Sequence, residues 1–381
     1  MTGAIFLPNL NKVRVVLPAD PDWQKYLNTL PHDFYHLAGY LELEAQRYGA
    51  TAEAIVIQHD AEVFFLPYLI RDCDYRSVRV ASRSENNPVY DVISPYGYPG
   101  MLVSLAGQNP QFIDRCLQTI YRYWQERNIC SAFLRLHPIL NSYLVDRPMS
   151  DRQESHQEIE VTERLHQRGD VVICDLTNDL EDIWKQIRSS HRTKINKLKR
   201  SGFIVKMVPI DRYLDIFIDI YRETMNRVNA TPSYYFTQDY FERFVNILGD
   251  GVQICVVEID GQIIAASLIT EFSGIVQYHL GGTRTEFLPY SPTTIVFDYV
   301  IKWAKQRQNR YFNLGGGLSG QQDSLYHFKV GFSDSTRSFA TLETIVDRQL
   351  YDRLTAQRAE SLGLTTSALS NTPFFPAYRA N

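Results

Sequence analysis

The sequence has few cysteines, and none of them is paired in a metal-binding spacing. The 381 residues contain five cysteines and nine histidines, without a CxxC pair or an HExxH-type pair. A disulfide framework, a structural zinc site and a catalytic metal are therefore not indicated. We expect buried thiols at all five positions, which are Cys73, Cys116, Cys130, Cys174 and Cys255.

The sequence also lacks long apolar runs. No segment approaches the roughly 20 apolar residues that cross a bilayer, and residues 1–8 do not resemble a signal peptide. With 44% hydrophobic and 22% charged residues, the composition predicts a soluble globular protein of two domains that stays in the cytoplasm without stable membrane insertion. The net charge of −4 argues against broad nucleic-acid affinity, so any RNA contact should use a local patch.

One long stretch lacks acidic residues altogether. Residues 183–210 contain neither aspartate nor glutamate, and basic side chains gather around His191. Such a stretch predicts a phosphate-binding surface, for a tRNA backbone or for the diphosphate of a nucleotide-linked or lipid-linked acceptor. For most of the lysines, a solvated helix face is the alternative. The basic residues are Lys185, Arg188, Arg192, Lys194, Lys197, Lys199, Arg200 and Lys206.

Strand and helix patterns alternate in the first half of the chain. A polar stretch at residues 148–170 then predicts a linker and the domain boundary. The expected elements are a strand at 13–17, a helix at 40–48, a hairpin of 54–58 with 62–70, a helix at 111–127 and a strand at 131–136.

The second half shows the order strand-strand-strand-helix-strand-helix-strand. Turns at Asp260-Gly261 and Ser273-Gly274 predict an antiparallel meander, and Thr293 or Thr294 is expected to cap the helix that follows it. The expected elements are strands at 252–258, 262–271 and 275–280, a helix at 294–306, a strand at 311–314, a short helix bearing Lys329, and a strand at 339–346.

Lys329 lies in an unusual position. Three glycines end the strand before it, and Leu325, Phe328 and Phe332 form an apolar helical stripe that includes Lys329. Because desolvating an ammonium group is costly, this placement indicates a charge held toward a cleft. The alternative is a lysine whose stem packs while its head reaches water.

These motifs resemble those of a known family. Residues 313–316 with 328–332, 223–230 with 234–236, and 191–197 are similar to motifs of the Fem-type aminoacyltransferases, which transfer amino acids from aminoacyl-tRNA to peptidoglycan precursors. Residues 90–100 resemble a segment of smaller Fem-like and GNAT-like proteins, including tRNA-dependent enzymes of antibiotic biosynthesis. The sequence has no long charged heptad insertion of the kind found in the larger Fem enzymes.

The resemblance implies an α+β fold of two tandem GNAT (N-acetyltransferase)-like domains. Each would have a central mixed, mostly antiparallel sheet flanked by helices. We expect residues 1–160 to form the N-terminal domain and residues 161–381 the C-terminal domain with the Fem-type signature. The donor would be an aminoacyl-tRNA co-substrate, with no cofactor. The acceptor would be an amine-bearing peptide, cell-wall precursor or small metabolite.

The loop at residues 281–294 bears on the donor. Acyl-CoA-dependent GNAT enzymes present a glycine-rich loop to the pyrophosphate here, whereas this loop has two prolines and no Gly-x-Gly before the helix. Gly281, Gly282, Thr293 and Thr294 are its candidate donor-binding residues. Free N–H groups at Thr293 and Thr294 would still suit one phosphate, so acyl-CoA is the alternative donor.

Lys329 is the candidate catalytic residue, because its charge would stabilise the oxyanion formed when an amine attacks the aminoacyl ester. No Ser-His-Asp or Cys-His arrangement is visible, and the general base is unassigned between His279, Tyr278 and the substrate itself. The alternatives are an acyl-CoA-dependent N-acyltransferase and a noncatalytic binding protein with a degenerate site. The other candidates are Arg192 for phosphate, Asp91 for an acceptor amine, and Tyr96, Tyr235, Tyr278 and His279 for substrate, with a buried ring as the alternative for each tyrosine.

Overall fold

The computed structural model describes residues 13–73, 88–145 and 161–380. The chain divides into two compact units, one of residues 1–167 with 340–381 and one of residues 168–339. Residues 340–381 thus group with the first unit, whereas we expected them in the C-terminal domain. They do so because residues 341–345 of strand β13 (Thr336–Ile345) pair with strand β6 (Ile129–Arg135) of the first unit.

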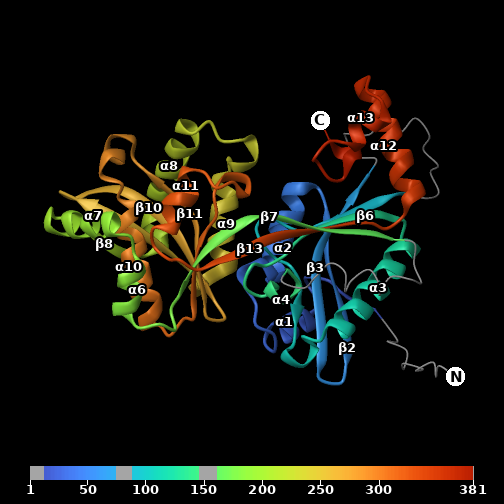
Figure 1. Cartoon of the computed structure of the whole chain (residues 1–381), viewed down its shortest axis with the longest axis horizontal. Helices are drawn as coiled ribbons and strands as arrows, with labels where there is room; N and C mark the ends of the chain where they lie inside the picture. Colours follow the sequence, from blue (N-terminus) through green and yellow to red (C-terminus); the bar gives the residue numbers. More distant parts are fainter. Residues whose placement is uncertain (1–12, 74–87, 146–160, 381) are drawn as a thin grey trace. The chain divides into compact units, whose positions relative to one another are not determined.

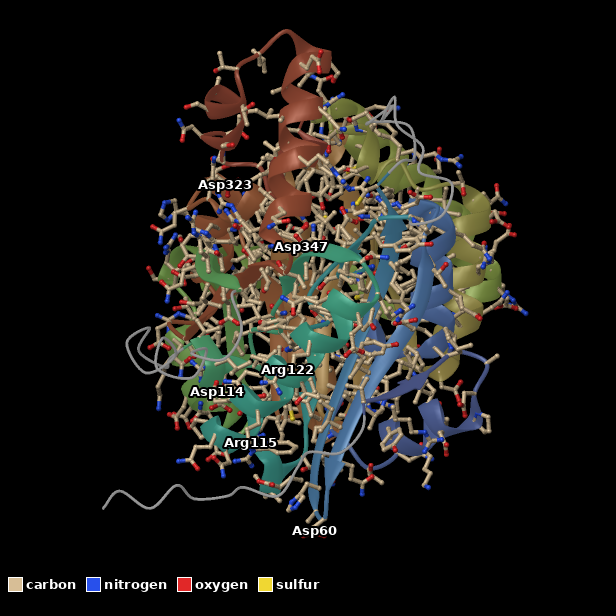
Figure 2. All side chains as sticks on the ribbon, turned by 90° about the vertical axis from the view of Figure 1, so that its right-hand side faces the viewer. Asp60, Asp114, Arg115, Arg122, Asp323 and Asp347 are labelled. Carbon is tan, nitrogen blue, oxygen red and sulfur yellow. The ribbon has the colours of Figure 1, made fainter. Side chains whose placement is uncertain are left out.

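The sheet of the first unit contains a long hairpin and one parallel pair of strands, and the strand at each of its edges is antiparallel to its neighbour. Strands β2 (Thr51–His59) and β3 (Glu62–Asp72) are antiparallel, and Asp60 lies at the hairpin tip with a φ of 52° (Figure 2). Strand β4 is antiparallel to β3 and parallel to β6, to which β13 is antiparallel. The other strands are β1 (Arg14–Val16), β4 (Tyr90–Ile93) and β5 (Leu102–Val103).

Helices cover both faces of this sheet (Figure 1). Neighbouring residues of β2 and β3 enter different apolar clusters, because successive side chains of a strand point to opposite faces. One cluster includes helix α3, and the other includes α1 and α2. The helices are α1 (Pro21–Leu27), α2 (Ala38–Tyr48), α3 (Pro110–Glu126), α4 (Ser142–Val145), α12 (Arg348–Leu362) and α13 (Thr366–Ser370), with short 3-10 turns η1 (Phe34–His36), η2 (Leu105–Gly107) and η8 (Ala377–Arg379).

The second unit repeats the same order of elements. Its sheet runs β7-β12-β11-β10-β9-β8, and β9, β10 and β11 form the expected antiparallel meander. Both turn dipeptides of the meander have positive φ throughout, as hairpin turns of this type require. The strands are β7 (Thr162–Asp175), β8 (Ile204–Val208), β9 (Val252–Ile259), β10 (Gln262–Phe272), β11 (Ile275–Thr283) and β12 (Tyr311–Gly315).

Helices α7 and α10 contact each other in the second unit, and α8 packs on β9, β10 and β11. The expected order from β9 to β13 is confirmed. The helices are α6 (Leu180–Gln186), α7 (Ser189–Arg200), α8 (Ile210–Arg227), α9 (Gln238–Leu248), α10 (Thr293–Gln306) and α11 (Ser324–Val330), with 3-10 turns η4 (Pro232–Tyr234), η5 (Gly249–Gly251), η6 (Thr285–Tyr290) and η7 (Leu318–Gly320).

Two sequence predictions are wrong in detail. Part of the predicted linker, residues 148–160, lies outside the described residues, but residues 162–170 belong to β7. Their side chains are half-buried or exposed, so the strand has no apolar alternation to reveal it. Helix α10 has Pro292 at its N-cap without a side-chain cap, where Thr293 or Thr294 was expected.

All five cysteines are buried free thiols, as predicted. Among the described residues, no helix is both long and apolar enough to cross a membrane.

Candidate functional site

The candidate site lies where two parallel strands of the second unit separate. Strands β11 and β12 pair only at residues 275–277 with 311–313, although β11 continues to Thr283. The side-chain amide of Asn313 donates to Oε1 of Gln277 at 3.0 Å and closes the end of the ladder. Because the strands are parallel, the segments that follow them, with Lys329 and the start of α10, emerge at the same edge of the sheet.

A β-bulge in β11 adds to this separation. Leu280 pairs with Leu268 and Tyr278 with Ile269, so His279 is the extra residue. Near the end of β11, the Thr224 hydroxyl of α8 accepts a hydrogen bond from the Thr283 N–H at 3.1 Å. Between the ladder and Thr283, no strand of the described chain pairs with the β12 side of β11.

The equivalent strands of the first unit stay together. Strands β4 and β6 pair to the last residue of β4, and Ser94 then donates its N–H to the Phe133 carbonyl at 3.0 Å. Helix α3, which follows as α10 does in the second unit, is capped by Asn109, whose side chain accepts from the Gln111 N–H. The opening between parallel strands is thus a property of the second unit.

Lys329 is buried at this edge of the sheet. Its side chain is in α11, only 7% of the residue is exposed, and Nζ donates to the Gly316 carbonyl at 2.7 Å. Burial lowers the pKa of Lys329 to about 8, and the nearby Asp323 carboxylate opposes this effect. The ammonium group therefore points into the protein. This differs from the alternative of a lysine whose stem packs while its head reaches water.

The glycine turn after β12 makes room for this ammonium. Gly315 has a φ of +80°, and a Cβ atom there would lie 3.0 Å from Nζ of Lys329. Helix α11 is capped by Asp323, whose carboxylate accepts from the Tyr326 N–H. The predicted apolar stripe is wrong at Leu325, which is 46% exposed. The inward position of Lys329 is set by the glycine turn.

An aromatic cluster holds the strands and helices of the site together. The Phe297 ring of α10 lies 5.0 Å from Tyr278 of β11 and 5.7 Å from Phe328 of α11, between ring centroids. The Phe332 ring also lies 5.0 Å from Phe297, between ring centroids. Tyr278, the N-terminal half of α10 and the helix bearing Lys329 therefore contact one cluster.

Tyr278 and His279 have different environments. The Tyr278 hydroxyl lies over Gly281, where a Cβ atom would be 2.0 Å from it, and burial raises the pKa of Tyr278 while a hydrogen bond with Ser267 lowers it. The His279 ring is stacked on Phe244 at 5.1 Å, and burial lowers the pKa of His279 to about 3. His279 is thus a neutral and weakly basic imidazole at neutral pH.

Most N–H groups of the donor loop are already engaged. Thr294 donates its N–H to the Ser291 carbonyl at 3.0 Å, and Ile295 donates to Pro292. The Thr285 N–H donates to the Glu223 carboxylate at 2.6 Å, so a carboxylate occupies a position where a phosphate would need a donor. The expectation of a free N–H at Thr294 is therefore wrong. The Thr294 hydroxyl has no hydrogen-bond partner in the described chain. Only 1% of the residue is exposed.

Of the other two candidates of this loop, Gly282 faces α8, and Thr293 is the half-buried first residue of α10, whose free N–H stays a prediction. A Cβ atom at Gly282 would lie 2.6 Å from the Thr224 hydroxyl, so α8 packs directly on this backbone. Tyr235, in the loop after α8, is 43% exposed and donates its hydroxyl to the Met225 carbonyl at 3.2 Å.

The basic helix α7 contacts the helix that bears Lys329. The His191 ring lies 4.7 Å from the Phe332 ring, its Nε2 is 3.0 Å from the Phe328 carbonyl, and Arg188 donates its N–H to the Gly331 carbonyl at 2.8 Å. Burial lowers the pKa of His191. Arg192 is half-buried, and its guanidinium donates to the Trp184 carbonyl at 3.4 Å.

Acidic residues neutralise part of the basic stretch. Lys199 pairs with Asp298, Lys206 with Glu258, and Lys185 with Glu181 and Asp182. For these three lysines, a structural or solvated role accounts for the charge. No carboxylate of the described chain pairs with Lys194, Lys197 or Arg200.

Asp91 and Tyr96 belong to the first unit. Asp91 is fully buried, and its carboxylate binds the guanidinium groups of Arg71 and Arg379 and the hydroxyl of Tyr378. It ties the C-terminal segment to β4, and its role as an anchor for an amine stays a prediction. Tyr96 is half-buried, its N–H donates to Glu44, and the Arg47 guanidinium lies 5.7 Å from its ring centre.

Sequence reasoning missed Gln277 and Glu223 as parts of the site. Gln277 is a buried polar residue that follows two apolar residues of β11, and this polar interruption is visible in the sequence. Glu223 was noted only within a motif. Its ion pair with Arg284, at 3.0 Å, joins residues far apart in the chain and has no local signal.

Comparisons with known proteins show what the chain resembles in its fold. Residues 185–329 match the family described as the acetyltransferase (GNAT) domain. The match to the solved structure of FemX spans 89% of this chain and 99% of the FemX chain, with 12% identity and a TM-score of 0.65. A conserved protein of unknown function from Bacteroides thetaiotaomicron VPI-5482 covers 87% of this chain and 99% of its own, with 11% identity and a TM-score of 0.52.

A third solved structure is the C-terminal domain of a putative lysylphosphatidylglycerol synthetase from Agrobacterium fabrum. It covers 84% of this chain and 90% of its own, with 12% identity and a TM-score of 0.50. No curated protein sequence matches the chain. The likeness to Fem-type proteins and the α+β, two-domain fold are confirmed: the chain has the fold of FemX, and residues 185–329 of its second unit match the GNAT domain model. These matches support an acyltransferase of the GNAT fold.

Proposed function

We propose that the protein is an aminoacyltransferase that forms an amide bond. The donor is an aminoacyl-tRNA, and the acceptor is an amine on a peptidoglycan precursor, a peptide or a small metabolite. The observation that carries the proposal is Lys329, a buried ammonium held by the Gly316 carbonyl beside the opening between β11 and β12.

In the proposed reaction, the neutral acceptor amine attacks the carbonyl carbon of the aminoacyl ester. A C–N bond forms and the carbonyl oxygen becomes an oxyanion, which the Lys329 ammonium stabilises. The C–O bond to the ribose then breaks, and the amine proton passes to the departing ribose oxygen. With a pKa of about 8, Lys329 carries its charge at neutral pH. Such a donor lowers the activation barrier by about 3 to 4 kcal/mol.

The donor loop favours tRNA over acyl-CoA. A pyrophosphate needs several free N–H groups, but Thr294 and Ile295 donate within the loop and Thr285 donates to Glu223. The Glu223 carboxylate would also repel a phosphate at this position. An aminoacyl ester carries no pyrophosphate and does not need this cradle.

Mass spectrometry of products from mixed charged tRNA and a library of peptide and UDP-linked amines tests the proposal. We expect a product heavier by one aminoacyl group, and no product when acetyl-CoA replaces the charged tRNA. Transfer from acetyl-CoA alone would favour the N-acyltransferase alternative. Failure of both donors would favour a noncatalytic binding protein.

A further inference from the structure

A surface next to the site combines basic and aromatic side chains. Tyr290, in η6, is 48% exposed, and its ring lies 5.4 Å from the ring of Phe203, which follows α7. The ring of Phe287 supports it at 6.2 Å. Tyr290 is thus a half-exposed aromatic ring held by two other rings. Such a ring is a stacking platform for a base.

Lysines of α7 flank this ring. Nζ of Lys194 lies 3.2 Å from the hydroxyl of Ser291, the residue after Tyr290. Lys197 lies three residues further along α7, on the neighbouring turn of the same face, and is exposed. Neither lysine pairs with a carboxylate of the described chain, unlike Lys199 on the other side of the helix. We call the surface formed by Lys194, Lys197 and Tyr290 the α7–η6 surface.

The α7–η6 surface leads to Lys329. At the start of α7, His191 contacts Phe328 and Phe332, which flank Lys329 in sequence. From His191 to Arg200 the helix extends about 14 Å, the length of about four stacked nucleotides. A single nucleic-acid strand lying along α7 would therefore have one end at Tyr290 and the other beside the helix that bears Lys329.

We propose that the α7–η6 surface binds the unpaired 3′ end of the donor RNA. Tyr290 stacks on a base, Lys194 and Lys197 contact the phosphates, and the terminal ester reaches Lys329. The proposal rests on the proposed function and adds the surface by which the donor is held. Charge complementarity and the stacking platform together favour single-stranded RNA. The exposed Leu288, 39% of which is accessible, makes an anionic bilayer the rival occupant.

Fluorescence anisotropy of the full chain tests this surface without requiring catalysis. The probes are an uncharged RNA minihelix with four unpaired 3′ nucleotides and the same minihelix with a blunt end. We expect tighter binding of the first. Tyr290→Leu should weaken that binding about 5- to 100-fold and leave the affinity for the blunt minihelix unchanged. Lys197→Gln should make the negative slope of log K against log salt shallower by about 0.7.

Lys185→Gln is the matched control, because Lys185 belongs to the same basic stretch but pairs with Glu181 and Asp182. Lys185→Gln should change the RNA affinity and the salt slope only by the small amount expected from the loss of one distant charge. Equal affinity for both minihelices, or wild-type affinity in Tyr290→Leu, would overturn the proposal. So would binding to phosphatidylglycerol vesicles that Tyr290→Leu abolishes while RNA binding persists.

The transfer assay separates this proposal from the proposed function. If aminoacyl transfer occurs but Tyr290→Leu leaves the KM for charged tRNA unchanged, only the α7–η6 surface is refuted. If no charged tRNA serves as donor, the proposed function fails whatever the minihelix binding shows.

Discussion

Replacing Lys329 with methionine should stabilise the second unit at neutral pH. Burial lowers the pKa of Lys329 from 10.5 to about 8, so keeping the ammonium charged in the folded protein at pH 7 costs about 3 kcal/mol. The methionine variant avoids this cost but loses the hydrogen bond to the Gly316 carbonyl, which is worth about 1.5 to 3 kcal/mol. We expect a net gain of about 1 kcal/mol.

The gain should depend on pH. Between pH 8 and 10.5 the unfolded chain binds a proton at Lys329 that the folded chain has released, so the stability of the wild type rises with pH across this range. The stability of Lys329→Met lacks this contribution. The advantage of the variant should therefore be largest below pH 8 and be lost by about pH 10.5.

Scanning calorimetry at pH 7 and pH 10 measures this difference. At pH 7 the variant should unfold about 2 to 4 °C above the wild type, and at pH 10 at or below it. Lys185→Met is the control, because Lys185 is exposed and should show no such pH dependence. A Lys329→Met protein destabilised equally at both pH values would refute a buried ammonium and indicate a lysine that reaches water.

Three further predictions concern geometry and binding. Gly281→Ala should lower turnover at least about 10-fold with about 1 to 3 kcal/mol loss of stability, because its Cβ would lie 2.0 Å from the Tyr278 hydroxyl; unchanged kinetics would show that this contact does not shape the site. Arg192→Ala should weaken a phosphate-bearing substrate by roughly 1.5 to 3 kcal/mol in titration calorimetry, and unchanged affinity removes Arg192 from the site. Arg379→Ala should cost about 2 to 4 kcal/mol in urea unfolding, because it removes one of two guanidinium partners of the buried Asp91; a loss below about 0.5 kcal/mol would contradict that reading.

The order of strands and helices in the second unit could be predicted because its signals are local. Asp260-Gly261 and Ser273-Gly274 provide the positive φ angles of two hairpin turns. The first half of β7 could not be predicted, since its polar side chains are half-buried or exposed and show no apolar alternation. The predicted cap of α10 is wrong because Pro292 precedes the helix and Thr294 is buried.

The inward placement of Lys329 could be predicted from its neighbours in sequence, but its environment could not. Its hydrogen bond to Gly316 depends on how the turn after β12 folds back over α11. The same applies to the separation of β11 from β12, which depends on pairing between distant strands. For Asp91, sequence reasoning proposed an amine anchor, whereas the carboxylate holds two arginines, of which Arg379 is near the C-terminus.

Single-turnover kinetics of aminoacyl transfer by Lys329→Met test the central claim most directly. With charged tRNA and an accepted amine, the rate should fall about 100- to 1000-fold while the affinity for both substrates changes little, because the oxyanion exists only after attack. The ratio of the wild-type rate to the Lys329→Met rate should also fall above about pH 8, where Lys329 loses its proton, because both proteins use the same neutral amine and its titration cancels in the ratio. A variant that transfers the aminoacyl group at a near-normal rate, or a rate ratio that stays constant through about pH 8 to 10, would contradict the role of the Lys329 ammonium.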